Sequence, residues 1–399
     1  MAVTRYVKYG LFSSALALLW TSVHTLYLPF RLLSLAPEEL KNTYLGLLTF
    51  AGLILAMLVQ PLAGAWSDRT RTAWGRRHPF ILAGTFLALL FLPGLSFSTT
   101  FLLLALSYGL LQVATNVAQG PFQAFIPDLV AEGERGRASG VKSLMEGLVA
   151  LAFLRLVAWF IEARGGGPVP AFLGAILLLA ALATFRLIKE PRKERGTTPF
   201  PGRPFHIDSR KSPYFAWFIL SRLLFAMAWA SLQAFAFYIL RDMMMVPDPV
   251  SQAGNFMLAV GGGMLLAVYP SGLLSDKVGR KPLLFLSGLL GAVGVAGLAV
   301  VRGEVGLLAL AGLLGLAVGA FLSTSWALAT DLVPPGEEAR YLGLANLATA
   351  GAAALSRLAG PLIDLLNRYG PALGYFALLA LCTLYFLGGS LLLFKVKAR

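Results

Sequence analysis

The chain contains few cysteines, histidines and acidic residues. Its 399 residues include 1 cysteine and 3 histidines, and 19 aspartates and glutamates stand against 33 lysines and arginines. A single cysteine, Cys382, excludes an intramolecular disulfide and a cysteine-based metal site. The histidines lie in separate segments, and no nucleophile–base pair accompanies them. The sequence therefore predicts no enzyme, no metal site and no cofactor.

Charge is scarce as well. Only 13% of the residues are charged, 57% are hydrophobic, and the mean hydropathy is +0.74. A soluble domain does not need so much apolar surface, so the composition indicates an integral membrane protein with the lipid bilayer as its partner. The net charge of +14 is of the kind that nucleic-acid-binding proteins show. Here the basic residues are confined largely to loops between apolar runs, which argues against nucleic acid as a partner.

Long apolar runs fill most of the chain. A helix needs about 20 residues to cross the roughly 30 Å hydrocarbon core of a bilayer. The first run continues from Leu11 past Leu28, too long for the apolar core of a cleaved signal peptide, so we expect it to be retained. The expected fold class is all-α integral membrane, with twelve transmembrane helices near 8–30, 42–66, 79–97, 99–128, 137–162, 169–188, 213–240, 250–275, 281–300, 305–332, 339–366 and 371–395.

The lysines and arginines indicate the orientation of these helices. If the N-terminus lies inside, 24 of the 33 basic residues fall on inner segments and 6 on outer segments. The other three lie within helices, at Arg155, Arg222 and Arg357. This asymmetry predicts a multi-pass protein of the cell membrane (inner or plasma), with both termini in the cytoplasm.

The two halves of the chain repeat each other. Asp128-Leu-Val-Ala-Glu-Gly-Glu-Arg135 matches Asp331-Leu-Val-Pro-Pro-Gly-Glu-Glu338 at an offset of 203 residues, and Gly75-Arg76 matches Gly279-Arg280 at 204. Chance similarity between apolar helices would not make the offsets of two separate loops agree to within one residue. The repeat predicts two pseudo-symmetric six-helix bundles within a monomer.

One long polar stretch separates the two repeats. It runs from 189 to 212 and contains four prolines and charges of both signs. This composition is typical of a linker, here a cytoplasmic one. The expected domains are therefore 1–188 and 213–399, joined by the linker 189–212.

A glycine–aspartate–basic loop occurs once in each half. The first reads Gly64-Ala-Trp-Ser-Asp68-Arg69 and then Gly75-Arg76-Arg77, and the second reads Gly272-Leu-Leu-Ser-Asp276-Lys277-Val-Gly279-Arg280-Lys281. The leading glycines permit close helix packing, and the aspartates cap helix N-termini or pair with the arginines. We interpret these loops as a gate that holds the two halves together on the cytoplasmic side. The alternative is that their charges only anchor the loops among lipid headgroups.

These loops resemble those of the major facilitator superfamily, whose Gly-x-x-x-Asp-Arg/Lys-x-Gly-Arg-Arg/Lys pattern the second loop fits. The first loop has four extra residues before Gly75. Its form, Ser67-Asp68-Arg69-Thr70-Arg71-Thr72 followed by Gly75-Arg76-Arg77-His78-Pro79-Phe80, resembles sucrose/proton symporters and, more distantly, glycoside–pentoside–hexuronide cation symporters. It departs from them at Ala73 and His78, where those families often have basic residues. The resemblance implies a secondary transporter of sugars that works by alternating access.

The predicted fourth helix has a polar stripe. Its members are spaced at i, i+3, i+4, i+7 and i+11, at Gln112, Thr115, Asn116, Gln119 and Gln123. Amides are unfavourable in lipid unless they meet partners or water. A stripe of uncharged donors and acceptors suits a neutral polyhydroxylated substrate, and the alternative is a polar seam between helices.

Other candidate substrate-binding residues lie on the first, seventh, tenth and eleventh helices. They are aromatic or polar, and aromatic faces stack on sugar rings. Asn346 and Thr349 correspond, at the offset of 203, to Ser143 and Glu146, which predicts polar groups at matching depth in both halves. The candidates are Trp20, His24, Trp229, Gln233, Ser325, Asn346 and Thr349.

Glu146 is the strongest candidate for carrying a proton. It lies about nine residues into its helix, and a buried carboxylate is readily protonated. His24 is a competing proton site, and pairing with Lys142 or Arg222 is the structural alternative. The helix expected at 42–66 has no acid, which favours protons over sodium. The expected buried cations are Arg155, Arg222 and Arg357, which leave acidic sugars open as substrates.

The sequence thus predicts import of a neutral sugar or glycoside together with a proton. No phosphate-binding glycine loop is present, so ATP bound to this chain does not drive transport. The alternatives are a multidrug or lipid exporter of the same superfamily, a passive sugar facilitator in which Glu146 is structural, and a receptor or assembly factor built on the same fold.

Overall fold

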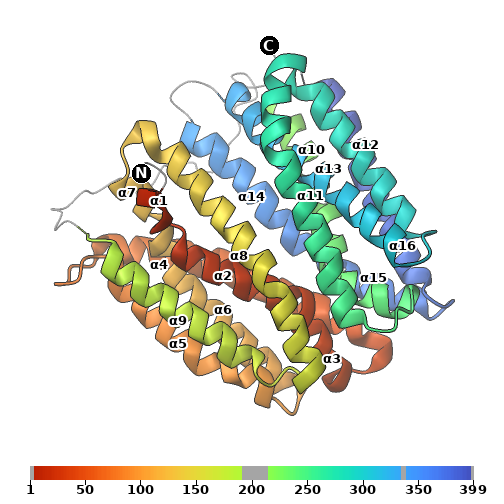
Figure 1. The fold of residues 1–399 in the computed structure, drawn as a ribbon, viewed down its shortest axis with the longest axis horizontal. Coiled ribbons are helices and arrows are strands. Elements are labelled where there is room, and N and C mark those ends of the chain that lie inside the picture. Colours follow the sequence, from red (N-terminus) through yellow and green to blue (C-terminus); the bar gives the residue numbers. More distant parts are fainter. Residues whose placement is uncertain (1–3, 191–213, 334–337, 397–399) are drawn as a thin grey trace. The chain divides into compact units, whose positions relative to one another are not determined.

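The structure, a computed structural model, describes residues 4–190, 214–333 and 338–396, which form helices and no β-strand (Figure 1). The first half contains α1 (Thr4–Val7), α2 (Leu11–Ser22), a π-helical segment η1 (Val23–Tyr27), α3 (Leu28–Leu35), η2 (Glu38–Leu40), α4 (Lys41–Arg69), α5 (His78–Phe97), α6 (Phe101–Gln123), α7 (Phe125–Leu129), η3 (Glu132–Glu134), α8 (Arg135–Arg164) and α9 (Val169–Leu187). The second half contains α10 (Phe215–Tyr238), a π-helical segment η4 (Ile239–Met243), α11 (Pro249–Val278), α12 (Arg280–Leu298), α13 (Glu304–Leu332), α14 (Glu338–Ser356), α15 (Ala359–Asn367), α16 (Leu373–Leu392) and η5 (Leu393–Lys395).

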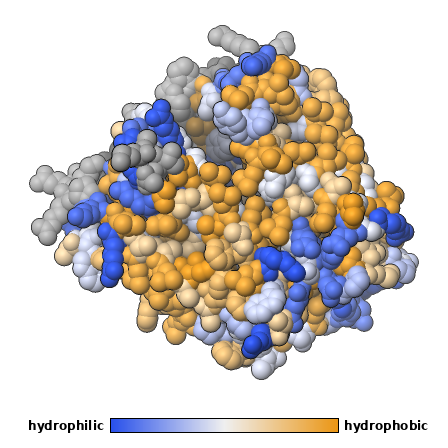
Figure 2. All heavy atoms as spheres, in the orientation of Figure 1, coloured by the Kyte–Doolittle hydropathy of each residue, from blue (hydrophilic) through white to orange (hydrophobic). Residues whose placement is uncertain are grey.

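Within these residues, 11 helical stretches are long and apolar enough to cross a membrane. Many of their large apolar side chains are exposed, including Leu62, Phe86 and Leu266. Figure 2 shows apolar residues over much of the visible face, with hydrophilic residues gathered in separate patches. Such exposure is the arrangement expected of helices that lie in lipid.

The prediction of one continuous helix over 339–366 is wrong. The stretch is divided into α14 and α15, with a turn at Arg357 and Leu358. Pro361 lacks the N–H that would bond the carbonyl of Arg357, and its ring would clash with that carbonyl. Gly360, whose N–H bonds the Arg357 carbonyl at 3.1 Å, lowers the helical preference further. Pro61, Pro93, Pro121 and Pro270 lie inside continuous helices.

The chain divides into two compact units. Unit 1 comprises Met1–Glu38 and Leu48–Thr198, and unit 2 comprises Glu39–Leu47 and Pro199–Arg399. Residues 39–47, which include the first residues of α4, thus belong to unit 2. Most of the expected linker 189–212 lies outside the described residues.

The same helix packing recurs in both units. In unit 1, α2 packs against α8 and α9, and α5 packs against α6 and α9. In unit 2, α10 packs against α14 and α16, and α12 packs against α13 and α16. The offsets found in the sequence pair α5 with α12 and α8 with α14, so the repeat is expressed as pseudo-symmetric bundles.

A buried polar network lies within unit 2 at the start of α4. Asp364 accepts hydrogen bonds from Asn42 Nδ2 (2.7 Å) and from the backbone N–H of Thr43 (2.6 Å). The carboxylate therefore satisfies a free N–H at the positive end of the helix. Tyr375 donates to Asp242 at 2.5 Å, and Asp242 pairs with Lys41 at 2.7 Å.

Candidate functional site

A chain of hydrogen-bonded polar side chains lies in unit 1 between α6 and η1. The hydroxyl of Tyr108 accepts a hydrogen bond from Gln112 Nε2 (2.8 Å) and lies 2.9 Å from His24 Nε2. Asn116 Nδ2 donates to the carbonyl of Gln112 (2.8 Å) and contacts its Oε1 (3.2 Å). Trp20 stacks on His24, with ring centroids 5.0 Å apart. The cluster joins donors and acceptors to an aromatic face, a combination that suits a sugar ring.

Local backbone features place these side chains. His24 lies in the π-helical segment η1, and π-helical insertions in α-helices are frequent at functional sites. Gly52 on α4 leaves room for the Tyr108 side chain, because a Cβ there would lie 2.5 Å from the Tyr108 hydroxyl. Tyr108, Gln112 and Asn116 follow one another at i+4 spacing, so they share one face of α6.

A second polar cluster surrounds Arg222 of α10 in unit 2. Its Nη1 donates to Ser325 Oγ at 2.5 Å, and its Nε donates to Thr349 Oγ1 (3.1 Å) and to the carbonyl of Ala345 (3.3 Å). The guanidinium lies over the ring of Trp326, 4.7 Å from its centroid. Arg222 is 3% exposed. Three helices, α10, α13 and α14, thus converge on one buried positive charge.

The first charged loop forms an ion-pair cluster within unit 1. Asp128 of α7 accepts from Arg76 (2.7 Å) and Arg77 (3.1 Å), and Arg77 also pairs with Asp68 at 2.6 Å. The Arg77 side chain is only 5% exposed, whereas that of Asp68 is 51% exposed. Two carboxylates from α4 and α7 therefore neutralise a buried arginine at the start of α5.

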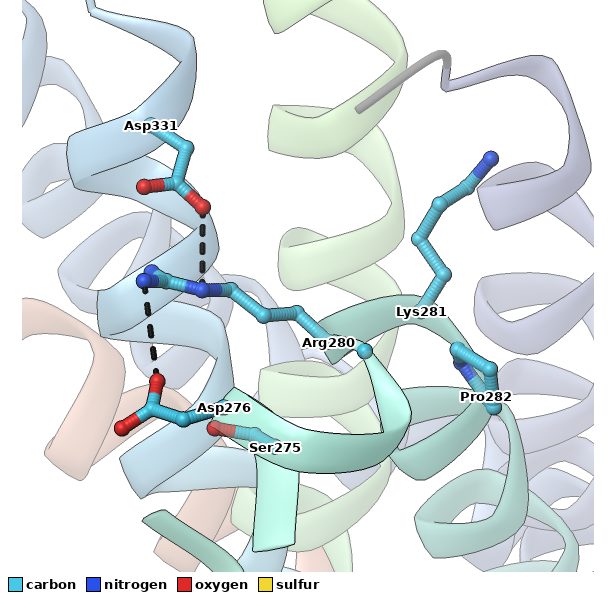
Figure 3. A pocket seen from close by; sticks show the side chains of 7 residues that line it. Ser275, Asp276, Arg280, Lys281, Pro282 and Asp331 are labelled. Atoms are coloured by element: carbon cyan, nitrogen blue, oxygen red, sulfur yellow. Dashed lines mark ion pairs between the residues drawn. The ribbon is translucent and has the colours of Figure 1, made fainter. Parts of the chain in front are cut away.

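The second charged loop repeats this arrangement within unit 2. Arg280 Nε lies 2.9 Å from Asp331, and its Nη2 lies 3.9 Å from Asp276 (Figure 3). The residues line a cavity of about 380 Å³, and the Lys281 side chain extends away from the two aspartates. The Asp331 side chain is 41% exposed, so this ion-pair cluster is more accessible to water than the corresponding cluster in unit 1.

The sequence model of the Major Facilitator Superfamily matches residues 2–356 and, in a second match, residues 244–399. The chain belongs to this superfamily. Members of the superfamily are membrane transporters rather than enzymes, in agreement with the expectation from the sequence.

Among curated relatives of this major facilitator, several are named sugar transporters. Sucrose transport protein SUC3 of Arabidopsis thaliana is 28% identical over 124 residues, which is 26% of this chain and 21% of the relative. Proton-associated sugar transporter A of Mus musculus is 32% identical over 127 residues, 28% of this chain and 16% of the relative. The matches thus span about a fifth of the length of these relatives.

Solved structures resemble the whole chain of this major facilitator. The nucleoside transporter NupG has a TM-score of 0.78 at 16% identity and covers 98% of this chain and 100% of its own. A bacterial homologue of the iron transporter ferroportin, in the inward-facing state, has a TM-score of 0.72 at 18% identity and covers 100% of this chain and 98% of its own. At these identities the likeness is one of fold.

The predicted stripe of α6 is only partly buried. Gln112, Thr115 and Asn116 are 1–3% exposed, Gln119 is half-buried and Gln123 is exposed. Thr115 donates to the carbonyl of Leu111 at 2.8 Å and so satisfies its own hydroxyl. The cluster therefore forms at the first residues of the stripe.

The candidate substrate-binding residues in unit 2 differ in burial and in their contacts with Arg222. Ser325 and Thr349 contact Arg222, whereas Asn346 is exposed and does not share that contact. Trp229 and Gln233 are half-buried and lie 7 and 11 residues beyond Arg222 on α10. This spacing places them on the Arg222 face of the helix.

Two expectations about charged residues are wrong. Glu146 was expected to be buried, but its side chain is 27% exposed and pairs with Lys142 at 2.9 Å. Arg155 was expected to be a buried cation, but its side chain is 46% exposed and lies 3.8 Å from Glu162. Arg155 lies nine residues, or two and a half turns, beyond Glu146 and therefore faces the opposite side of α8. Arg222 and Arg357 are buried as expected.

The expected packing role of Gly64 is also wrong. A Cβ on Gly64 would meet nothing within 4 Å. The close approach of α4 and α6 instead requires Gly120, whose Cβ would lie 3.2 Å from the backbone N of Gly64. Gly272 does fit the expectation, because its Cβ would lie 3.1 Å from Ser323 Oγ. Gly75 and Gly279 have positive φ angles of +97° and +96°, a backbone conformation that favours glycine.

Two residues were absent from the predicted site. Tyr108 holds the unit 1 cluster together, and its signal was available, since it lies at i−4 from Gln112 and extends the stripe by one turn. Glu190 has no such signal, because its partners are 112–114 residues away in the sequence. It accepts hydrogen bonds from the backbone N–H groups of Arg76 (2.8 Å) and His78 (2.9 Å).

Glu190 caps the N-terminus of α5 from the start of the expected linker. Its Oε1 also lies 2.5 Å from His78 Nδ1, and its side chain is 6% exposed. Burial by itself would raise the pKa of Glu190, but hydrogen bonds from the His78 side chain and from the backbone of residues 76–78 hold this pKa below its ordinary value of 4.5. The charged carboxylate is therefore the form that stabilises the folded protein.

The substitution Glu190→Gln is expected to lower the stability by about 1–3 kcal/mol at neutral pH, because it removes charge-assisted hydrogen bonds. The pKa of Glu190 is lowered in the folded protein. The difference in stability between wild type and Glu190→Gln is therefore at its full size above pH 4.5, and it disappears as the pH falls through the folded pKa. Thermal unfolding of the detergent-purified protein between pH 3 and 7 measures it. Glu134→Gln removes an exposed ion pair with Arg5 and serves as the control. A difference that stays constant with pH would contradict the cap.

Proposed function

We propose that this protein imports a sugar or glycoside together with a proton by alternating access. The observation that carries the proposal is the chain formed by His24, Tyr108, Gln112 and Asn116, beside the aromatic face of Trp20. Hydroxyl, amide and imidazole groups in one row match the hydroxyls of a sugar. An exporter of apolar drugs or lipids has no need for such a row.

The curated relatives support the sugar assignment, because they are named for sucrose transport and proton-associated sugar transport. The structural neighbours named for nucleoside and iron transport share the fold and do not bear on the substrate. The excess of basic residues on one set of loops supports a cell-membrane protein with both termini in the cytoplasm.

Two groups are candidates for proton coupling. Glu146 pairs with Lys142, so proton binding to the carboxylate would release the lysine. His24 lies within the polar chain, where its protonation would change the hydrogen bond to Tyr108. One proton moving through 100 mV yields about 2.3 kcal/mol. That energy supports roughly 40-fold accumulation, so a single titrating group is sufficient.

Uptake into proteoliposomes tests the proposal. We expect labelled sucrose, maltose or glucuronate to accumulate in wild type only with an inward proton gradient. Glu146→Gln is expected to abolish accumulation while sugar exchange persists, since exchange needs no net proton movement. His24→Gln under the same conditions identifies the alternative carrier.

The other outcomes separate the alternatives. Equilibration without accumulation in wild type would make the protein a facilitator, with Glu146 structural. Accumulation that persists in Glu146→Gln but is lost in His24→Gln would move the coupling to His24. Absence of flux for every sugar would overturn the sugar assignment and favour the exporter.

A further inference from the structure

We infer that Arg222 binds a negatively charged group, a carboxylate or a phosphate, carried by the transported substrate. The inference rests on the proposed function and narrows it, from sugars in general to sugars that bear an oxyanion, such as uronic acids. The sequence favoured a neutral sugar because the stripe on α6 has no charge. Unit 2 supplies the charge that the stripe lacks.

The first argument is that Arg222 is a buried cation with neutral neighbours. Its hydrogen-bond acceptors are the hydroxyls of Ser325 and Thr349 and the carbonyl of Ala345. Among the side chains that the structure describes, no carboxylate forms an ion pair with it. A buried charge without a counter-charge is unfavourable, and in membrane proteins such a residue is by default a functional one. An anion bound there would remove the imbalance.

The second argument is that donors remain available on the guanidinium. Arginine has five N–H groups, and the hydrogen bonds use the Nε–H and one N–H of Nη1. Nη2 has no hydrogen-bond partner in the described part of the chain. It is not one of the polar atoms that are both fully buried and without a partner, so a ligand can reach it. Nη1 and Nη2 together present the fork that binds a carboxylate or phosphate through two parallel hydrogen bonds.

The third argument is that the guanidinium is held in a fixed orientation. Thr349 and Ser325 hold Nε and Nη1, and the rings of Trp326 (4.7 Å) and Phe321 (6.0 Å) lie against the guanidinium. An arginine held at these two nitrogens presents Nη2 without further loss of side-chain freedom.

The other two arginines within the predicted helices lack this arrangement. Arg155 is exposed and lies near the carboxylate of Glu162. Arg357 lies at the break between α14 and α15, and its Nε is fully buried. The Arg222 face of α10 also carries Trp229 and Gln233, which supply a ring surface and an amide for the rest of a sugar.

The repeat gives independent support. At the offset of 203, the counterpart of Thr349 is Glu146. The half of the chain that contains Arg222 thus has a hydroxyl where the other half has a carboxylate. An acid at 349 would neutralise Arg222 from within unit 2, whereas the threonine present there leaves the positive charge for a ligand.

Binding to the purified full-length protein in nanodiscs tests the inference. The probes are glucuronate, glucose 6-phosphate and the neutral glucose, with inorganic phosphate as a plain anion. Wild type is expected to bind at least one anionic sugar about tenfold or more tightly than glucose, as a bidentate arginine contact implies. Arg222→Gln is expected to lose that preference and keep the affinity for glucose. Arg222→Lys keeps the charge without the fork and is expected to fall between them. Arg155→Gln is the matched control and is expected to bind as wild type does.

The outcomes distinguish this inference from the proposed function. Equal binding of glucose and both anionic sugars in wild type would overturn the anion site and leave sugar transport standing. Tighter binding of inorganic phosphate than of any sugar, abolished in Arg222→Gln, would support the anion site and overturn the sugar assignment. Binding of no probe by folded wild type would overturn both. If Arg222→Gln does not fold, Arg222→Lys decides. An anion preference in Arg222→Lys equal to that of wild type would contradict a bidentate contact through Nη1 and Nη2.

Discussion

Replacing Asp128 with asparagine is expected to destabilise the protein by about 2–3 kcal/mol. Asp128 pairs with Arg76 and Arg77, and the side chain of Arg77 is only 5% exposed. Removal of one partner from a buried ion pair leaves an uncompensated charge, which costs about 3–5 kcal/mol. The loss here is smaller because Asp68 still pairs with Arg77 at 2.6 Å. Thermal unfolding in detergent measures the effect as a fall in Tm of several degrees.

The repeat provides a matched control for this substitution. Asp331 occupies the same place in unit 2, but it is 41% exposed and its partner Arg280 is 24% exposed. Water and headgroups can replace the lost carboxylate there, so Asp331→Asn is expected to cost less than about 1 kcal/mol. If the two substitutions lowered Tm equally, burial of Arg77 would not be the reason for the effect.

Replacing Gln112 with leucine is expected to lower sugar uptake, as kcat/KM, by about 30-fold or more. Gln112 donates to the hydroxyl of Tyr108 and contacts Asn116, so leucine removes two hydrogen bonds that order the cluster. Two such bonds are worth about 2–3 kcal/mol together, and each 1.4 kcal/mol is a factor of ten. Because Gln112 is 2% exposed, the expected effect acts through the positions of Tyr108 and His24.

Gln123 offers the control for Gln112. It belongs to the same predicted stripe of α6 but is exposed, so Gln123→Leu is expected to change uptake less than about twofold. A second readout separates a binding role from a packing role. If uptake in Gln112→Leu falls only in proportion to the amount of folded protein, the stripe is a seam between helices.

Helix content and the repeat follow directly from the sequence. Membrane helices satisfy their own backbone hydrogen bonds, so about 20 apolar residues specify one without help from distant residues. The recurring offset of the two charged loops likewise requires no knowledge of packing. The superfamily was evident for this reason, because the pattern from Gly272 to Lys281 is contiguous in the chain.

Burial of single charges was less predictable. Arg155, Arg222 and Arg357 look alike in sequence, since each interrupts an apolar run. Only the packing of the helices distinguishes them, and it leaves Arg155 exposed while Ser325 and Thr349 enclose Arg222. Glu146 illustrates the same point, because its depth along α8 says nothing about which way the side chain faces.

The sequence by itself determined an all-helical membrane protein of two repeated halves, because helical period, apolar length and basic loops are local properties. Tertiary structure alone decided which residues from other helices hold Tyr108, and that Glu190 caps α5 from 112 residues away. These features arise from contacts between residues far apart in the chain. Such contacts depend on how whole helices pack, which local preference does not encode.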